Sequence, residues 1–436
     1  MELKPLKGTR DLLPEEMIIR QKVLDRIKNV FEIFGFQPLE TPALEAWEVL
    51  SAKGAGGEEI LKETYNFEDL GKKRVGLRYD LTVPLARVIA SNPNLNLPFK
   101  RYQIQNVWRY GDVSKGRLRE FLQADIDIVG SKSMLADVEV IACAITCLQS
   151  LNFKDFLVRI NNRKILSALV KFCESEEKSL EIFRSLDKLE KIGKENVKKE
   201  LEEKGVSKQS IKKIFEFLEL DESPEKIFEK IESLGIEEGK EGIDELREIL
   251  FYLEQIGMKE RVKVDLSLAR GLDYYTGPIF EISAGGKIGS IAGGGRYDKL
   301  ISLLCGREIP ATGISLGIER IIEVMKERKM VERKKSKVEV FVATVNEEVL
   351  KKSLKIIQTL RKNGIKTDFD LRERNLTRQL EYANSLGVPF VIIIGEKELE
   401  ENKVRIRDMK ERKENEMRLE DALEFLKNKF VKGSSR

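Results

Sequence analysis

The chain has 436 residues, of which 41% are hydrophobic and 35% are charged, and its formal net charge is +4. Such a length exceeds what one hydrophobic core organises, so two or three domains are expected, and the small net charge permits nucleic-acid binding without requiring it. The sequence contains no histidine, which excludes Ser-His-Asp and Cys-His catalysis and histidine-ligated metals, so any chemistry must depend on Arg, Lys, Tyr, carboxylates or a bound cation.

The N-terminal region begins with "MELKPLKGTRDLLPEE", which has no apolar signal region. The most apolar run of the chain, "PFVIIIG" at 389–395, has the length of one buried strand and is too short to span a membrane. We therefore expect a soluble protein of the cytoplasm. Residues 14–35 are predicted to form an amphipathic helix, and "FGFQPLETPALE" after it to form a strand entering a loop.

Three segments are next predicted to be antiparallel strands of one sheet: residues 74–80, 100–110 and 120–130. A polar, basic loop with glycine, "GDVSKGRLR", separates the second from the third. In the third strand, Gln123, Asp125 and Asp127 project from one face because they stand two residues apart. That face is either a solvent-exposed polar side of the sheet or the floor of a pocket for a small, polar, zwitterionic ligand, and both interpretations fit the pattern equally.

The middle of the chain continues with a predicted helix at 135–150 and a strand at 155–162. From 163 to about 260, Lys and Glu alternate with Leu and Ile at helical spacing, which indicates a solvated helical insertion. Strand-like sequence returns at 262–284 and continues until Gly317, where a helix begins. Because no histidine is available to complete a zinc site, we interpret the four cysteines as buried structural residues of a reducing compartment: Cys143, Cys147, Cys173 and Cys305.

The C-terminal region is predicted to be a compact α/β module with a partly parallel sheet, after a charged linker at 326–337. Its predicted strands are residues 338–345, 366–370, 389–395 and 403–409. Its predicted helices are residues 347–363, 376–386 and a segment from about 418.

Three arginines stand at the ends of predicted elements in apolar, glycine-punctuated surroundings: Arg109, Arg270 and Arg320. A single arginine is more often a surface residue, but an unpaired guanidinium is costly near a core, and a polyphosphate would supply the missing partner. The glycine-rich peptides at 292–298 and 313–317 either let backbone approach a ligand closely or form flexible turns. Neither matches a Walker A loop or a dinucleotide fingerprint.

Several peptides in one order carry a resemblance to a known family. They are "KGTRDLLPEE", "LETPALE", "VWRYGDVSKGRLREFLQADIDIVG", "ARGLDYYTG", "AGGGRYD" and "GISLGIER". The second, third and last resemble motifs 1, 2 and 3 of class II aminoacyl-tRNA synthetases, and "ARGLDYYTG" with "AGGGRYD" resembles the peptides that distinguish histidyl-tRNA synthetases. Over nearly its whole length the chain resembles that family.

The resemblance implies an α+β fold, in which helices flank a class II antiparallel sheet of six or more strands. It divides the chain into a catalytic domain at 1–325, with the helical insertion at about 170–260, the linker at 326–337 and an α/β anticodon-binding domain at 338–430. A homodimer joined through motif 1 is also implied.

The implied function is the ATP-dependent attachment of L-histidine to tRNA(His) through a histidyl-adenylate, releasing AMP and diphosphate. ATP with Mg²⁺ is the expected substrate complex, and no prosthetic group is expected. The alternatives are a non-catalytic, histidine-binding regulatory paralogue of histidine biosynthesis, a pure RNA-binding or sensor module, and another class II specificity. The three arginines and the extra domain favour the enzyme over the paralogue, and "GLDYYTG" argues against another specificity.

The resemblance also implies roles for single residues. Arg109 matches the motif 2 arginine that holds the ATP α-phosphate and the amino-acid carboxylate, Arg320 the motif 3 arginine at the γ-phosphate, and Arg270 the catalytic arginine at the α-phosphate. Asp80, Leu81, Thr82 and Gln123 match the residues that surround the amino and carboxylate groups of the histidine substrate. Asp127 and Tyr275 match those around its imidazole, and Tyr274 and Tyr297 match residues that line the pocket. In addition, Gly271 and Gly277 leave space for backbone and ligand, while Asp273 has no assigned role.

One departure concerns the adenine. The family usually has an acidic residue two positions after the motif 2 arginine, whereas this chain has Gly111 there, followed by Asp112. Either the loop is shifted by one residue, which makes Asp112 an ATP contact, or the adenine is bound differently.

Overall fold

The computed structural model describes residues 3–52, 58–220, 222–270, 274–285 and 288–430. Contacts between residues divide the chain into two compact units. The first, here called the N-terminal unit, comprises Met1–Asp11 and Val23–Met330, and the second, the C-terminal unit, comprises Leu12–Lys22 and Val331–Arg436. Helix α1 (Pro14–Ile33) contributes residues to both, and each unit is described by itself.

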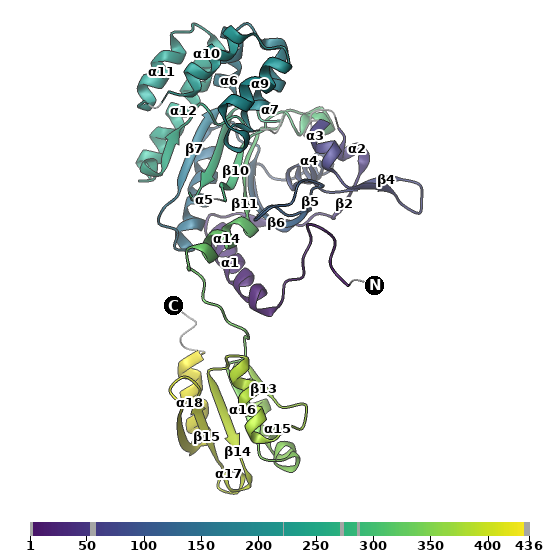
Figure 1. The fold of residues 1–436 in the computed structure, drawn as a ribbon, viewed down its shortest axis with the longest axis vertical. Coiled ribbons are helices and arrows are strands. Elements are labelled where there is room, and N and C mark those ends of the chain that lie inside the picture. Colours follow the sequence, from purple (N-terminus) through teal and green to yellow (C-terminus); the bar gives the residue numbers. More distant parts are fainter. Residues whose placement is uncertain (1–2, 53–57, 221, 271–273, 286–287, 431–436) are drawn as a thin grey trace. The chain divides into compact units, whose positions relative to one another are not determined.

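An eight-stranded sheet lies at the centre of the N-terminal unit, with the order β1-β5-β6-β11-β10-β9-β7-β8 (Figure 1). In that order the strands are β1 (Gln37–Pro38), β5 (Phe99–Trp108), β6 (Glu120–Val129), β11 (Ala311–Gly317), β10 (Ser290–Arg296), β9 (Pro278–Ser283), β7 (Leu157–Asn162) and β8 (Val262–Val264). Only the outermost pairs, β1 with β5 and β7 with β8, are parallel among these described strands. The predicted α+β class with a mainly antiparallel sheet is confirmed.

The strand predicted at 74–80 is shorter than expected and belongs to a different sheet. Strand β4 (Arg74–Leu77) pairs with β2 (Leu44–Ala46) and β3 (Asn66–Glu68) in a separate three-stranded sheet. The prediction of one common sheet is therefore wrong, because alternation along a segment indicates a strand without identifying its partner. The chain leaves β4 before Asp80, whose side chain binds the start of helix α4 (Thr82–Ser91).

Helices cover the large sheet and form the predicted insertion. Helix α5 (Met134–Ser150) is apolar almost throughout and packs against β6, β11 and α12, and α14 (Ile318–Glu327) packs against β6, β10 and β11. The insertion comprises α6 (Arg163–Phe172), α7 (Ser179–Leu186), α8 (Leu189–Ile192), α9 (Lys194–Glu203), α10 (Lys208–Leu218), α11 (Pro224–Glu232) and α12 (Glu237–Gln255). The shorter helices are α2 (Trp47–Leu50), α3 (Glu58–Glu63) and α13 (Ser302–Cys305).

The C-terminal unit holds a five-stranded sheet with the order β13-β12-β14-β15-β16. Its strands are β12 (Val340–Thr344), β13 (Thr367–Phe369), β14 (Phe390–Ile394), β15 (Lys403–Asp408) and β16 (Lys413–Arg418), and its helices are α15 (Glu347–Lys362), α16 (Leu376–Ser385), α17 (Glu396–Glu400) and α18 (Leu419–Phe430). The first three strands in the order are parallel and the others antiparallel, so the prediction of a partly parallel sheet is confirmed. Strand β16 is absent from the prediction because "KENEMR" is polar and mostly exposed, so it carries no hydrophobic alternation.

Candidate functional site

A cavity of about 720 Å³ in the N-terminal unit brings most of the candidate residues together. The predicted site residues that line the cavity are Asp80, Thr82, Arg109, Asp112, Gln123, Asp127, Arg270, Tyr274, Tyr275, Tyr297 and Arg320. Leu81 is fully buried beneath it, and its backbone oxygen accepts a hydrogen bond from Arg101. Gly271 and Asp273 lie outside the described residues.

The floor of the cavity is built by one face of β6. Gln123, Asp125 and Asp127 are 7%, 3% and 3% exposed and all line the cavity. The intervening residues Ala124 and Ile126 are also buried and point to the opposite face of the sheet, which belongs to the core. A solvent-exposed polar side of the sheet is therefore the wrong interpretation, and the pocket floor is the correct one.

Asp127 is held by partners from two neighbouring elements. Arg101, which is opposite Asp127 in the register of β5 and β6, forms an ion pair with it at 2.6 Å between Nη2 and Oδ2. The hydroxyl of Tyr297 donates to Oδ1 of the same carboxylate. Burial raises the pKa of Asp127, while Arg101 opposes that shift. The carboxylate therefore has a fixed direction in the cavity.

Asp80 and the tyrosines form a second polar group in the cavity. Oδ1 of Asp80 accepts hydrogen bonds from the backbone N–H groups of Thr82 at 3.2 Å and Val83 at 3.0 Å, and Tyr274 donates to Oδ2 at 3.4 Å. The Tyr274 ring packs edge-on against the rings of Tyr275 and Tyr297. Burial raises the pKa of Tyr275 to about 12, so its hydroxyl keeps its proton at neutral pH.

The three predicted arginines line the cavity from three different elements. Arg109 follows β5, donates from Nε to the backbone oxygen of Tyr79 at 3.1 Å, and its guanidinium carbon lies 4.2 Å from the centre of the Tyr79 ring. Arg320, in the first turn of α14, donates to the backbone oxygen of Ser290 at 2.6 Å. Both guanidinium groups retain donors that these contacts do not use.

Arg270 differs from the other two because it has a carboxylate partner. Its Nη1 lies 2.9 Å from Oε2 of Glu281, and Glu281 also pairs with Arg159. The backbone of Arg270 has a φ of +41°, which lies in the left-handed region that L-residues uncommonly adopt. The expectation that all three arginines lack a protein partner is therefore wrong for Arg270.

The arginines form a region of like charge. Burial lowers the pKa of Arg320, and Arg109, Arg117 and Arg270 lower it further through repulsion. Cations held together in this way are destabilised until an anion neutralises them. This arrangement favours a multiply charged anion such as a polyphosphate as the ligand.

The three glycines of the peptide at 292–298 lie in β10, so a flexible turn is the wrong interpretation. A Cβ on Gly293 would lie 2.0 Å from Nη1 of Arg270, and a Cβ on Gly313 would lie 2.0 Å from Oδ1 of Asp127. These two glycines therefore provide the space in which the guanidinium of Arg270 and the carboxylate of Asp127 lie.

Replacing Gly293 by alanine tests this packing. The new methyl group displaces the flexible end of Arg270 while the strand remains intact, so we expect the rate of any reaction that depends on Arg270 to fall by about 10²-fold, the effect of a displacement of ~1 Å. A Cβ on Gly294 would instead meet the backbone oxygen of Gly313 at 2.0 Å. Gly294→Ala is therefore expected to destabilise the fold by about 1–3 kcal/mol. Thermal unfolding and kinetics of both variants check the contrast, and equal stability losses would contradict it.

Three residues that line the cavity or contact its lining are absent from the predicted site: Arg101, Arg117 and Glu63. The sequence pattern does not identify Arg101, because only the register of β5 against β6 places it beside Asp127. Arg117 belongs to the basic loop and lines the cavity beside the arginines. Glu63 of α3 accepts a hydrogen bond from the Tyr79 hydroxyl, and its Oε1 lies 3.2 Å from where a Cβ on Gly111 would be. The space beside Gly111 therefore already contains a carboxylate, contributed by a distant segment.

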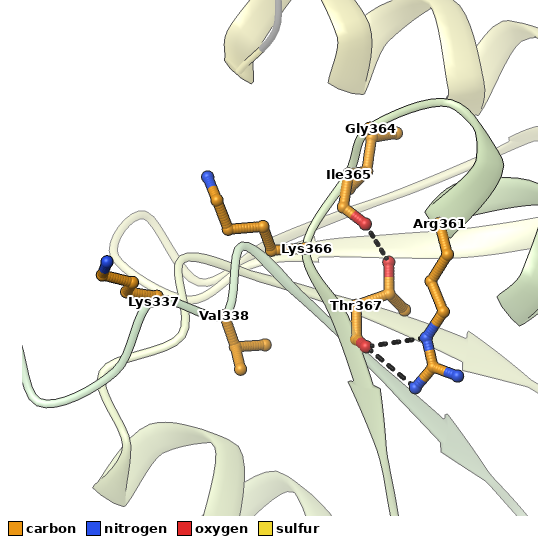
Figure 2. Close-up of a pocket in the computed structure, with 7 residues that line it drawn as sticks. All are labelled: Lys337, Val338, Arg361, Gly364, Ile365, Lys366 and Thr367. Atoms are coloured by element: carbon orange, nitrogen blue, oxygen red, sulfur yellow. Dashed lines mark hydrogen bonds between the residues drawn. The ribbon is translucent and has the colours of Figure 1, made fainter. Parts of the chain in front are cut away.

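A second, shallower cavity of about 410 Å³ lies in the C-terminal unit (Figure 2). It is lined by Lys337, Val338, Arg361, Gly364, Ile365, Lys366 and Thr367. All three of its cations already have partners: Arg361 donates to the backbone oxygen of Thr367, Lys366 pairs with Glu339, and Lys337 donates to the side-chain oxygen of Gln21. Its side chains do not include the carboxylates and tyrosines that select a small zwitterion.

Within the described ranges, no group of three or more Cys, Asp or Glu side chains is suited to a metal ion, and no helix has the length and apolar character needed to cross a bilayer. All four cysteines are free, and three of them are buried as predicted, whereas Cys305 is partly exposed.

Comparisons with known proteins agree with the geometry. A family model described as histidyl-tRNA synthetase matches residues 8–321, and one described as anticodon binding domain matches residues 339–429. The histidine–tRNA ligase of Aeropyrum pernix is 41% identical over 403 residues, covering 91% of each chain. That of Korarchaeum cryptofilum is 40% identical over 425 residues, covering 96% of this chain and 98% of its own. The crystal structure of histidyl-tRNA synthetase from Nostoc sp. PCC 7120 has a TM-score of 0.84 at 32% identity, covering 99% of this chain and all of its own.

Proposed function

The chain belongs to the histidyl-tRNA synthetase family and is a class II aminoacyl-tRNA synthetase, and from this premise we propose that it attaches L-histidine to tRNA(His) through a histidyl-adenylate. The observation that supports the proposal most directly is a single cavity that joins buried carboxylates and tyrosine hydroxyls with three arginines. Such a lining suits a zwitterionic amino acid with an imidazole beside a triphosphate.

In the first step, a carboxylate oxygen of histidine attacks the α-phosphorus of ATP. The new bond between this oxygen and phosphorus forms while the bond from the α-phosphorus to the oxygen that bridges it to the β-phosphorus breaks, and diphosphate leaves. The nucleophile is already deprotonated at neutral pH, so no general base is required. Catalysis then depends on alignment and on stabilising negative charge, which arginines achieve without any histidine in the chain.

In the proposed mechanism, each of the three arginines has its own role in binding or stabilising the phosphates of ATP. Arg109 holds the α-phosphate and the substrate carboxylate, Arg270 stabilises the charge that develops on the α-phosphate, and Arg320 binds the γ-phosphate. Burial and, after it, repulsion from neighbouring arginines lower the pKa of Arg320, and this repulsion supports these roles because ATP relieves it. Asp112 is exposed at the rim of the cavity, which suits a contact to the nucleotide.

Mg²⁺ enters with ATP as part of the substrate complex. ATP-binding sites commonly hold Mg²⁺ through one or two carboxylates and the substrate phosphates, without a dedicated protein cage. Glu281 and Glu319 line the cavity, and the described residues contain no cluster of three ligands. This donor set fits an ion that is held mainly by the phosphates, and no prosthetic group is needed.

Histidine is selected in the proposal by two hydrogen-bonding groups. Asp127 receives one imidazole N–H, and the Tyr275 hydroxyl meets the other ring nitrogen, while Tyr274 and Tyr297 pack around the ring. Asp80, Thr82 and Gln123 surround the amino and carboxylate groups. An apolar competitor leaves these polar groups unpaired, and such sites discriminate by roughly 10⁴-fold or more.

In the second step, a ribose hydroxyl at the acceptor end of tRNA attacks the carbonyl carbon of the adenylate, and AMP leaves. The basic loop at 114–119 meets this end in the proposal, and the domain at 338–430 meets the anticodon. The enzyme acts as a cytoplasmic homodimer joined through motif 1. Leu44 and Phe67, apolar residues that are 46% and 49% exposed on the sheet containing β2 and β3, support an interface there.

ATP–diphosphate exchange with each of the twenty amino acids tests the activation step. We expect exchange with histidine to exceed exchange with every other amino acid by at least about 10³-fold, because only an imidazole satisfies Asp127 and Tyr275 together. Charging of tRNA(His), followed by release of AMP, tests the transfer step. If histidine were bound without any exchange, the regulatory alternative would replace the proposal.

A further inference from the structure

The floor of the cavity contains a buried carboxylate that the proposed reaction has not yet used. Asp125 lies between Gln123 and Asp127 on β6, lines the cavity and is 3% exposed. Within the described ranges, Oδ1 of Asp125 and Oε1 of Gln123 are buried without a hydrogen-bond partner. Leaving a buried acceptor unpaired costs free energy, so these neighbouring oxygens favour a ligand that brings N–H donors.

The groups that face Asp125 explain why the ligand should be a cation. On β5, Gln103 is opposite Asp125, and Arg101 is the cation that acts on it. That guanidinium is already bound to Asp127, Gln103 and the backbone oxygen of Leu81. On β11, the Ser315 hydroxyl hydrogen-bonds to the carboxylate. The remaining charged neighbours are Asp127 on the same strand and Asp80 before α4, both of which repel Asp125.

Asp80 has less capacity for a further donor than Asp125. Its Oδ1 already accepts two backbone N–H groups, and its Oδ2 accepts the Tyr274 hydroxyl. Asp125 keeps an oxygen available, and so does Gln123, which stands two residues before it on the same face of β6. A primary ammonium has three N–H donors and one positive charge, which matches two adjacent acceptors among three carboxylates.

We propose that Asp125 binds the α-ammonium of the amino-acid substrate, with Gln123 as the second acceptor. This assignment rests on the proposed function, because it places the substrate in the same cavity. It separates recognition of the ammonium by Asp125 from recognition of the imidazole by Asp127, although the two residues are neighbours on one strand face.

Binding of the ammonium by Asp125 should depend on pH. Burial raises the pKa of Asp125 to about 7, Arg101 opposes the shift, and Asp127 adds to it. The carboxyl group is therefore partly protonated at neutral pH before a ligand binds. An ammonium binds the ionised form, so binding displaces a proton, and affinity falls as the pH decreases below about 7.

Two histidine analogues separate the amino group from the imidazole. Histidinol keeps the ammonium and the imidazole, whereas 3-(imidazol-4-yl)propionate keeps the imidazole and lacks the ammonium. We expect Asp125→Asn to weaken histidinol binding by about 10–100-fold, the effect of losing a hydrogen bond to a charged group, and to leave the propionate unchanged. In exchange assays of the full-length protein, KM should rise for histidine and stay constant for ATP.

Calorimetry in two buffers of different ionisation enthalpy provides a second test, which compares the two analogues first in the wild-type protein and then in Asp125→Asn. Near pH 7, the wild-type protein should release more protons on binding histidinol than on binding the propionate. The shared imidazole cancels in this comparison, and the difference should vanish in Asp125→Asn. Equal proton release, or an equal loss of affinity for both analogues in the variant, would overturn the role of Asp125. Failure of the wild type to bind either analogue would instead overturn the proposed function itself.

Discussion

Replacing Arg270 by alanine is expected to lower the rate of histidyl-adenylate formation by roughly 10²–10³-fold, the usual effect of removing one preorganised donor to a developing negative charge. The loss should appear in kcat, because the α-phosphate gains charge in the transition state. Arg270→Lys keeps the charge without the planar fork and should retain intermediate activity. Single-turnover measurement of adenylate formation is the appropriate assay.

The same replacement should have little effect on folding. Glu281 loses Arg270 but keeps its ion pair with Arg159, so no buried carboxylate is left unpaired. Arg247→Ala is a matched control, since Arg247 lies in the helical insertion, is exposed and pairs with Glu232. This control should change neither activity nor stability measurably. An Arg270→Ala enzyme that forms adenylate at the full rate would contradict the proposed role.

The main features of the fold were predictable because local pattern and burial agree. Strand β6 is long and apolar on the face that it turns to the core, and helix α5 is apolar almost throughout, so period and length identify them. The pairing of β4 and the existence of β16 were not predictable in the same way. The pairing of β4 depends on which strands lie beside it, and β16 has a polar sequence at the edge of its sheet.

In the candidate site too, residues that follow a local pattern could be predicted, and residues placed by strand register could not. Gln123 and Asp127 could be predicted because their spacing and the family peptides indicate a common face. Arg101 could not, because its alternating strand also suits a surface arginine until the register places it opposite Asp127. Glu63 lies beside Gly111 although the two are far apart in sequence, and no local pattern predicts such proximity.

Replacing Asp127 by asparagine should impair histidine recognition and stability together. The carboxylate forms a 2.6 Å ion pair with Arg101, and both side chains are almost completely buried. Removing one charge of such a pair leaves the other uncompensated, which typically costs about 3–5 kcal/mol of folding stability. We also expect kcat/KM for histidine to fall by about 10²-fold or more, because a charged acceptor for the imidazole N–H is lost. Denaturant unfolding and diphosphate exchange measure the two effects.

A second replacement separates the structural role of Asp127 from its role in binding. In Arg101→Met combined with Asp127→Asn, no unpaired guanidinium remains, and replacing a buried ion pair by neutral side chains of similar volume is often close to neutral for stability. The double variant should therefore recover most of the stability that Asp127→Asn loses. It should not recover histidine recognition, because the carboxylate is still missing from the floor of the cavity. Recovery of both properties would mean that Asp127 acts only by compensating Arg101, and that the imidazole is recognised elsewhere.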